Sequence, residues 1–211
     1  MDKESIVLDH LKPLYISLGE DCSISYHLNL HGLREFAYPF DYALFKDVIK
    51  LISFIDDIFQ DNISSFFDKS NWIFKELKKP THLIENKITW SKYKAINKIY
   101  KCEYPHEFTD QLDWKNFVEK YSRRIDRLKQ ITKSDRSIIF IRGTNILNNK
   151  LIDNNIDTIK EYEKNNKLLE DCLKKHFSNY KNIIYINFNN YLWIDGIDSW
   201  TRSNINLLDF L

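Results

Sequence analysis

The sequence is poor in the residues that mark linkers, disulfide scaffolds and membrane spans. Of its 211 residues, four are glycine, four are proline and three are cysteine, which argues against low complexity. No apolar run approaches the roughly 20 residues of a membrane helix, and no apolar stretch follows the charged N-terminus, so we expect neither a span nor a signal peptide. Cys22, Cys102 and Cys172 lie far apart without a C-x-x-C pair. The sequence therefore predicts no disulfide scaffold, no metal site and a reducing, cytoplasmic location.

An excess of charge of one sign is also missing from the chain as a whole. The formal net charge is +1, which argues against a generally basic nucleic-acid binder. Residues 81–136 carry 13 basic and 8 acidic side chains, and we interpret this excess as a solvated helix face. Apolar residues make up 43% of the chain, enough for a sizeable core. We expect one domain over residues 1–211, with residues 62–105 as an irregular insert.

Apolar runs and helical periodicity alternate along the rest of the chain. Short apolar runs predict strands at 14–18, 137–142 and 182–188. Apolar residues at helical spacing predict helices at 45–59, 113–131 and 156–177, and a short helix ending near Gly32. A helix between two strands favours parallel pairing. The expected fold class is α/β, with a mostly parallel sheet covered by helices on both faces in three layers.

Ligands of parallel α/β sheets bind beyond the carboxyl ends of the strands. The polar residues at those ends are therefore our candidates for a binding site. The first strand leads to Gly19, Glu20, Asp21 and Cys22, the second to Arg142, Gly143, Thr144 and Asn145, and the third to Asn187, Asn189, Asn190, Trp193, Asp195 and Asp198. No phosphate-loop, H-E-x-x-H or C-x-x-C pattern accompanies them, so we expect no cofactor.

Cys22 is the sharpest single candidate for catalysis. A thiol in the first turn of a helix feels the positive end of the helix dipole, and free N–H groups there solvate a thiolate. Both effects lower its pKa and make it a better nucleophile, although Glu20 and Asp21 act in the opposite direction. The alternative is a small buried apolar residue. Cys102 and Cys172 lie in apolar or helical surroundings and are expected to be packing residues.

Two further residues could complete a catalytic group. His106 follows Pro105 among aromatic neighbours, where it is either a base or a structural turn residue. Asp41 lies between large apolar residues, so its carboxylate needs a partner. It could orient an imidazole, as the third member of a triad does, or it could cap the helix expected to begin near Ala43.

Several of these stretches resemble a family of uncharacterised bacterial and large-DNA-virus proteins described as papain-like cysteine peptidases. The matching blocks are Leu-Gly-Glu-Asp-Cys at 18–22, Gly-Leu-Arg at 32–34, Pro-Phe-Asp-Tyr at 39–42, Tyr-Pro-His-Glu-Phe at 104–108 and Arg-Arg at 123–124. The resemblance implies Cys22 as nucleophile and His106 as base. It also implies a papain-like α+β fold as the alternative, with the cysteine on a helix and the histidine on an antiparallel sheet. A viral source would place the protein in the host cytoplasm.

A looser similarity points to esterases that carry a G-D-S-L motif. Residues 18–22 look like their nucleophile turn with cysteine in place of serine, but no histidine follows Asp195 to Asp198.

Three hypotheses therefore remain. The first is a thiol hydrolase or acyl transferase with Cys22, His106 and Asp41 as catalytic residues. The second is an esterase-like or glycan-modifying enzyme in which Cys22 is not the nucleophile. The third is a binding module without catalysis.

The sequence also predicts a set of ligand contacts. They are Gly19, Glu20, Arg142, Asn145, Trp193 and Asp198, acting on a small-molecule, peptide or glycan substrate. Arg142 would bind a carboxylate or phosphate, and Asn145 would help to hold an oxyanion. We expect no nucleic acid and no membrane as partners, and the sequence does not indicate an oligomeric state.

Overall fold

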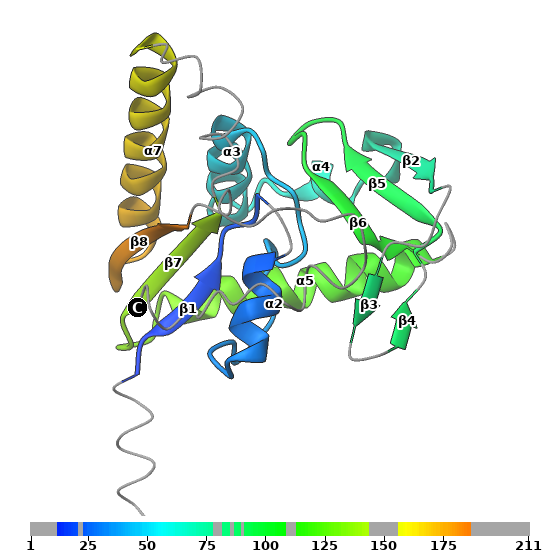
Figure 1. The fold of residues 1–211 in the computed structure, drawn as a ribbon, viewed down its shortest axis with the longest axis horizontal. Coiled ribbons are helices and arrows are strands. Elements are labelled where there is room, and N and C mark those ends of the chain that lie inside the picture. Colours follow the sequence, from blue (N-terminus) through cyan, green and yellow to red (C-terminus); the bar gives the residue numbers. More distant parts are fainter. Residues whose placement is uncertain are drawn as a thin grey trace, which may run out of the picture.

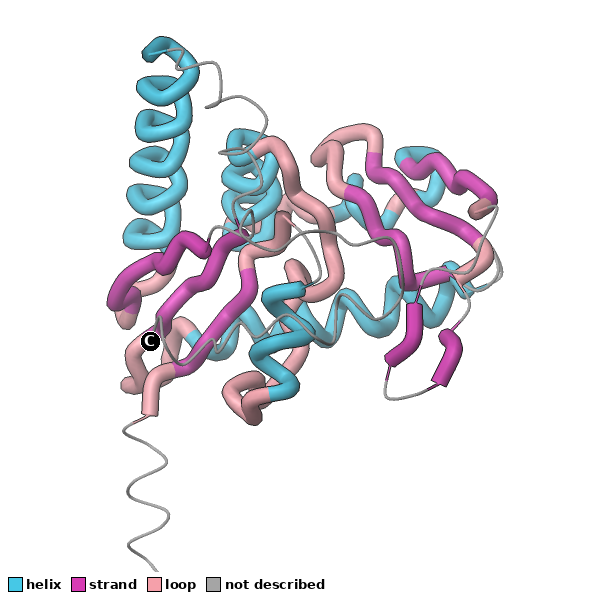
Figure 2. The backbone as a smooth tube through the Cα atoms, viewed as in Figure 1, coloured by secondary structure: helices cyan, strands magenta, loops and turns pink. Residues whose placement is uncertain are grey.

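The structure is a computed structural model, and it describes residues 12–20, 23–77, 82–84, 87–89, 91–108, 113–143 and 156–186. Its strands fall into two main groups, drawn in magenta in Figure 2. Strands β1 (Leu14–Ser17), β7 (Ile138–Gly143) and β8 (Tyr180–Ile186) form one sheet in the order β1-β7-β8. Both pairings are parallel. The parallel β-α-β arrangement predicted from the apolar runs is therefore confirmed.

The second sheet is antiparallel and was not predicted. It has the order β2-β5-β6, from strands β2 (Trp72–Glu76), β5 (Tyr93–Asn97) and β6 (Glu103–Phe108). A two-stranded pair, β3 (His82–Ile84) and β4 (Lys87–Thr89), is also antiparallel. The fold is thus a mixed α/β arrangement rather than one mostly parallel sheet. Residues 62–105, expected as an irregular insert, thus contain β2, β3, β4 and β5, and residues 99–100 lie in the turn between β5 and β6.

Five helices connect these strands in the described parts of the chain. They are α2 (Ser23–Leu30), α3 (Val48–Phe59), the short α4 (Ser64–Phe67), α5 (Trp114–Ile131) and α7 (Ile156–His176), and a 3-10 turn spans Lys69–Asn71. Helix α3 was expected to begin at Phe45, but it begins three residues later. Asp47 is its N-cap, and the Asp47 side chain accepts a hydrogen bond from the Lys50 N–H at 3.1 Å, which satisfies a free donor of the first turn.

Side chains of β7 alternate between two apolar clusters. Ile138 and Phe140 belong to the large core that also contains residues of α3, α5 and α7. Ile139 and Ile141 pack with Ile24 of α2 in a smaller cluster. Successive strand side chains point to opposite faces of a sheet, so α2 covers the face of the parallel sheet opposite to the large core. All six β7 residues are buried, as the unbroken apolar run predicts.

Helix α5 joins the two sheets, as Figure 1 shows. Near its N-terminus, the Phe117 ring lies 5.1 Å from Trp72 of β2, centroid to centroid. At its C-terminus, the Ile131 carbonyl accepts a 3.0 Å hydrogen bond from Asn179, just before β8. Its buried residues follow the predicted apolar periodicity. None of the helices in the described ranges is long and apolar enough to cross a membrane.

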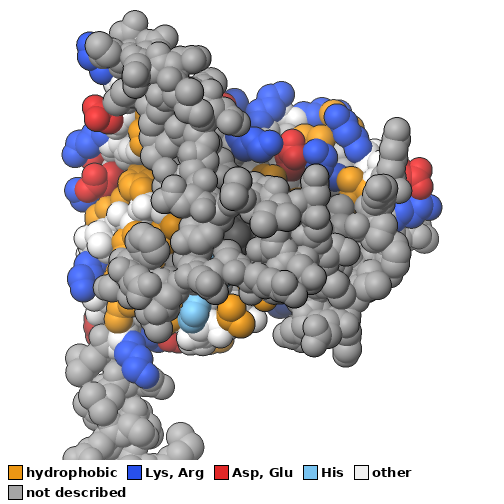
Figure 3. Space-filling view, in the orientation of Figure 1, with side chains coloured by type: hydrophobic (Ala, Val, Ile, Leu, Met, Phe, Trp, Pro, Cys, Tyr) orange, Lys and Arg blue, Asp and Glu red, His pale blue; other side chains and the backbone are white. Residues whose placement is uncertain are grey.

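Basic side chains are visible over the antiparallel sheet in Figure 3, with acidic side chains among them. Lys94 pairs with Glu103 at 2.9 Å, and Lys92 with Glu76 at 3.9 Å. The basic excess of residues 81–136 is therefore partly neutralised within that sheet.

Candidate active site at the edge of the parallel sheet

The chain leaves β1 through a turn with two consecutive residues of positive φ. Gly19 has φ +75° and Glu20 has φ +88°. A Cβ added at Gly19 would lie 2.9 Å from the carbonyl oxygen of Ala43, so both the backbone conformation and the lack of space require glycine there. Glu20 is a buried non-glycine residue, 4% exposed, in a region that L residues rarely adopt. Such strain costs about 1–3 kcal/mol and is found mostly at functional sites.

Cys22 lies outside the described residues, and so does Asp21. In the chain Cys22 stands two residues after the strained Glu20 and directly before Ser23, the first residue of α2. The described backbone on both sides of it therefore consists of a strained turn and the start of a helix. Its catalytic role and its expected low pKa stay predictions.

Arg142 is the last residue but one of β7 and contacts two other segments at this edge of the sheet. Its guanidinium donates hydrogen bonds to the carbonyl oxygen of Leu18 at 3.2 Å and to that of Phe45 at 2.7 Å. The residue is 2% exposed. Arg142 thus ties the end of β1 and the segment before α3 to the end of β7, as the meeting of parallel strand ends predicts. These contacts give the guanidinium a structural role, and binding of a substrate anion stays a prediction.

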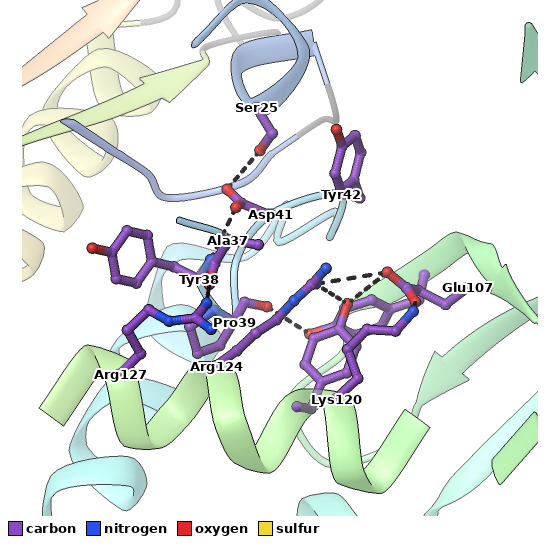
Figure 4. A network of polar contacts seen from close by, with 12 residues as sticks. Ser25, Ala37, Tyr38, Pro39, Asp41, Tyr42, Glu107, Lys120, Arg124 and Arg127 are labelled. Carbon is purple, nitrogen blue, oxygen red and sulfur yellow. Dashed lines mark hydrogen bonds and ion pairs between the residues drawn. The ribbon is translucent and has the colours of Figure 1, made fainter. Parts of the chain in front are cut away.

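Asp41 is fully enclosed and fixed by three groups. The Ser25 hydroxyl donates to Asp41 Oδ1 at 2.8 Å, and the backbone N–H of Tyr38 donates to Oδ2 at 2.9 Å (Figure 4). A guanidinium nitrogen of Arg34 lies 3.6 Å from Oδ2. Burial raises the pKa of the Asp41 carboxyl, while Arg34 and the two hydrogen bonds act in the opposite direction. The carboxylate therefore binds α2 to the loop that precedes α3.

The predicted alternative for Asp41, an N-cap of the following helix, is wrong. Asp47 caps α3 instead, because the helix begins at Val48 rather than near Ala43. The Asp41 oxygens accept their hydrogen bonds from Ser25 and from the turn at Tyr38. The prediction that this carboxylate needs a partner is confirmed by these contacts, and the residue is 1% exposed.

A second group of buried charges lies next to His106 in the chain. The Glu107 carboxylate of β6 accepts hydrogen bonds from Lys120 and, at 3.1 Å, from the Tyr121 hydroxyl. Arg124 donates to the same hydroxyl at 3.0 Å, and its guanidinium lies 3.7 Å from Glu107 (Figure 4). Burial and the Glu107 charge raise the pKa of Tyr121 well above its ordinary value, so this hydroxyl stays a neutral donor. The cluster fixes β6 to α5.

His106 itself lies in β6, an antiparallel strand paired with β5. The structure describes the backbone of His106 but not its side chain. The backbone position agrees with the implied papain-like arrangement, in which the histidine is on an antiparallel sheet. The role of His106 as a base stays a prediction, as does the contact between its ring and Cys22.

The blocks of the sequence that resemble the family converge around the Asp41 loop. Arg34 pairs with Asp41, Glu107 lies beside Arg124, and the positive charge of Arg124 also lowers the pKa of Asp41. Arg124 was expected on a solvated helix face, and this was wrong, since its side chain is 11% exposed. The exposed neighbour Arg123 does fit that expectation.

Some of these residues were predicted from the sequence and others were not. Gly19, Glu20, Asp41 and Arg142 were predicted, and they lie near the β1 end or in the loop before α3. Ser25, Arg34, Glu107 and Arg124 were not predicted as site residues. The signal for the last three was their place inside the family-like blocks, whereas nothing in the local pattern marked Ser25. Asn145, Trp193, Asp195 and Asp198 lie outside the described residues.

The chain is similar to known proteins over most of its length. The sequence is 26% identical over 227 residues to "Uncharacterized protein R408" of Acanthamoeba polyphaga mimivirus, and this similarity covers 94% of the chain and 96% of the relative. No solved structure matches the chain. Residues 13–185 match the profile of a family described as "Putative papain-like cysteine peptidase (DUF1796)". This match runs from the residue before β1 to the last residue but one of β8, and the chain belongs to that family.

Proposed function

We propose that the protein is a thiol-dependent hydrolase or acyl transferase with Cys22 as its nucleophile. The observation that carries this proposal is the strained, buried turn at Gly19 and Glu20 between β1 and α2. A sharp turn of this kind between a strand and a helix presents a nucleophile at the edge of a sheet, close to the free N–H groups of the helix start. The family membership agrees with thiol chemistry at this coarse level.

The proposed mechanism follows that of other thiol hydrolases. His106 takes the proton of the Cys22 thiol, and the thiolate attacks the carbonyl carbon of the substrate. Backbone N–H groups at the start of α2, with Asn145, stabilise the oxyanion. The proton then passes from His106 to the leaving group, which departs and leaves an acyl-enzyme. Water, or another acceptor in a transferase, attacks the acyl-enzyme and restores the thiol.

Asp41 has two roles in this proposal. Through Ser25 it holds α2, and therefore the chain around Cys22, in a fixed position. Each carboxylate oxygen has two lone-pair sites, so Asp41 can also accept an imidazole N–H beside its present hydrogen bonds. The second role orients His106 and stabilises the imidazolium, as the acidic residue of a triad does.

The substrate contacts belong to the same proposal. Gly19, Glu20 and Arg142 line the ends of β1 and β7, and we extend the pocket to Asn145, Trp193 and Asp198. Arg142 donates hydrogen bonds to Leu18 and Phe45, and its positive charge suits a substrate carboxylate or phosphate. A peptide, a glycan or another small acyl compound fits this set of charged, amide and aromatic side chains. We also infer three layers around the parallel sheet, from the two clusters on its opposite faces.

A generic ester tests this chemistry without knowledge of the natural substrate. We expect p-nitrophenyl acetate to acylate Cys22 and to release one equivalent of p-nitrophenolate per chain in a burst. Cys22→Ala abolishes the burst and leaves the far-ultraviolet circular dichroism unchanged. Cys102→Ala, which alters a fully buried cysteine, is the matched control and keeps the burst. A burst of equal size in Cys22→Ala would refute the mechanism.

The parallel sheet favours one second candidate, an esterase-like enzyme in which Cys22 is not the nucleophile. The observation is the pairing of β1, β7 and β8, all parallel, with β1 followed by a turn and a helix. Iodoacetamide separates the two candidates. Ester cleavage that persists after complete alkylation of Cys22 favours the esterase-like enzyme, and loss of cleavage favours the thiol hydrolase.

A further inference from the structure

Helices α3 and α7 pack side by side on the parallel-sheet side of the molecule (Figure 1). Where they meet, Asp56 of α3 faces Cys172 and His176 of α7. The three side chains offer a carboxylate oxygen, a thiol sulfur and an imidazole nitrogen, and these ligand atoms all lie within 4.8 Å of one another. This cluster lies outside the site proposed above and includes none of its residues.

The spacing of the two α7 ligands suits a metal ion. Cys172 and His176 are four residues apart, so they lie one turn apart on the same face of the helix. His176 Nε2 already lies 2.6 Å from Asp56 Oδ1. The third ligand is the Asp56 carboxylate of α3, so the three ligands come from both helices at their interface.

The side chains are also held in place by their surroundings. The His176 ring stacks on Phe59, with the centroids 4.6 Å apart and the planes 12° apart. Phe59 lies one turn after Asp56 on α3. Cys172 is 6% exposed. Fixed ligands lose little conformational entropy when an ion binds, which favours binding.

We propose that Asp56, Cys172 and His176 form a Zn²⁺ site that links α3 to α7. Thiolate sulfur, imidazole nitrogen and carboxylate oxygen are the ligands that Zn²⁺ takes in proteins, and three of them leave a fourth tetrahedral position for water. On binding, Cys172 loses its thiol proton to the solvent and His176 binds as neutral imidazole. Burial raises the pKa of the Cys172 thiol to about 12 in the chain without metal, and the dication reverses this effect.

Lys175 provides a specific test, because it competes with the metal for Asp56. Its ammonium nitrogen lies 2.8 Å from Asp56 Oδ1. Lys175→Ala removes this competing cation and is expected to increase Zn²⁺ affinity several-fold. Lys174→Ala is the matched control, since Lys174 pairs with Glu170 on α7, and it leaves the affinity unchanged.

The full chain is first reduced and freed of metal with a chelator. It is then titrated with Co²⁺ and afterwards with Zn²⁺. We expect one Co²⁺ per chain, a thiolate-to-metal absorption band in the near ultraviolet, and displacement of the band by one equivalent of Zn²⁺. Cys22→Ala keeps the band. Cys172→Ala abolishes it, and His176→Ala weakens Zn²⁺ binding at least tenfold. Circular dichroism tests whether each variant is folded. If Cys172→Ala does not fold, the Zn²⁺ affinity of His176→Ala tests the proposal instead.

Three outcomes would overturn the proposal. The first is the absence of a thiolate band at one equivalent of Co²⁺. The second is a band that persists in folded Cys172→Ala, which would assign the metal to another thiol. The third is Zn²⁺ binding that neither His176→Ala nor Lys175→Ala changes, which would show that the cluster is an ion-pair network only.

Discussion

The Ser25 hydroxyl on α2 donates a 2.8 Å hydrogen bond to Asp41 Oδ1, and both side chains are buried. The pair joins a helix to a loop 16 residues further along the chain. It connects the helix that begins next to the proposed nucleophile with the carboxylate proposed to orient the base. This contact therefore helps to hold α2 in place relative to the Asp41 loop.

Removal of the Ser25 hydroxyl is expected to destabilise the fold. Ser25→Ala leaves a buried carboxylate without one of its donors, and a hydrogen bond to a charged group contributes about 1.5–3 kcal/mol. We expect a loss of that size in the free energy of unfolding, measured by urea denaturation. Ser53→Ala is the control, because the Ser53 hydroxyl bonds to the Ile49 carbonyl at an exposed position of α3. Equal effects of the two substitutions would contradict the account of Asp41.

The turn after β1 is expected to tolerate no side chain at Gly19. Gly19→Ala combines a left-handed backbone with a Cβ only 2.9 Å from the Ala43 carbonyl oxygen. Gly32→Ala meets the backbone cost alone, about 1–2 kcal/mol, because φ is +66° and no heavy atom lies within 4 Å of the added Cβ. Thermal unfolding of both variants measures the difference. A Gly19→Ala protein as stable as Gly32→Ala would show that the turn is not tightly packed.

Substitution of two neighbouring arginines of α5 is expected to lower the free energy of unfolding by very different amounts. Arg124→Met removes the guanidinium beside the buried Glu107 and leaves that carboxylate with fewer partners. Loss of one member of a buried pair costs about 3–5 kcal/mol, and this range is an upper limit for Arg124→Met because Lys120 still pairs with Glu107. Arg123→Met changes an exposed residue and is expected to cost less than about 0.5 kcal/mol. Urea denaturation of the two variants measures this difference. Similar losses of unfolding free energy would refute the buried network.

Alkylation of the native protein is expected to modify one cysteine. Burial raises the pKa of Cys172 to about 12 and that of Cys102 further, so neither thiol ionises appreciably near pH 8. Intact mass spectrometry after iodoacetamide treatment should therefore show a single adduct, which Cys22→Ala removes. Two or three adducts on the folded chain would contradict the buried positions of Cys102 and Cys172.

The parallel half of the fold could be predicted from the sequence, because its signals are local. Strands β1, β7 and β8 are short apolar runs, and α5 shows a long helical periodicity. The antiparallel sheet could not be predicted in the same way. Its strands are partly exposed and carry paired charges, such as Lys94 and Glu103, so only the short apolar run at the start of β2 marks them. Pro105 lies in β6, an edge strand of this sheet, where a missing N–H is tolerated.

The candidate site was predictable only as a set of strand ends. Parallel pairing placed Gly19 and Arg142 at one edge, and the structure agrees through the Arg142 contact with Leu18. The partners of Asp41 and Glu107 depend on tertiary packing between segments far apart in the chain. Such contacts leave no periodic signal in the sequence, because they form between α2, β6, α5 and the loops that these elements contact only in the folded chain.

The pH dependence of Cys22 alkylation tests the central claim most directly. The rate of iodoacetamide modification, followed from pH 5 to 10, reports the pKa of the Cys22 thiol in the native chain. The account predicts a midpoint well below the value of about 8.5 for a free cysteine, and a higher midpoint in His106→Ala, which loses the proposed imidazolium partner. A midpoint near 8.5 that is the same in both proteins would contradict it.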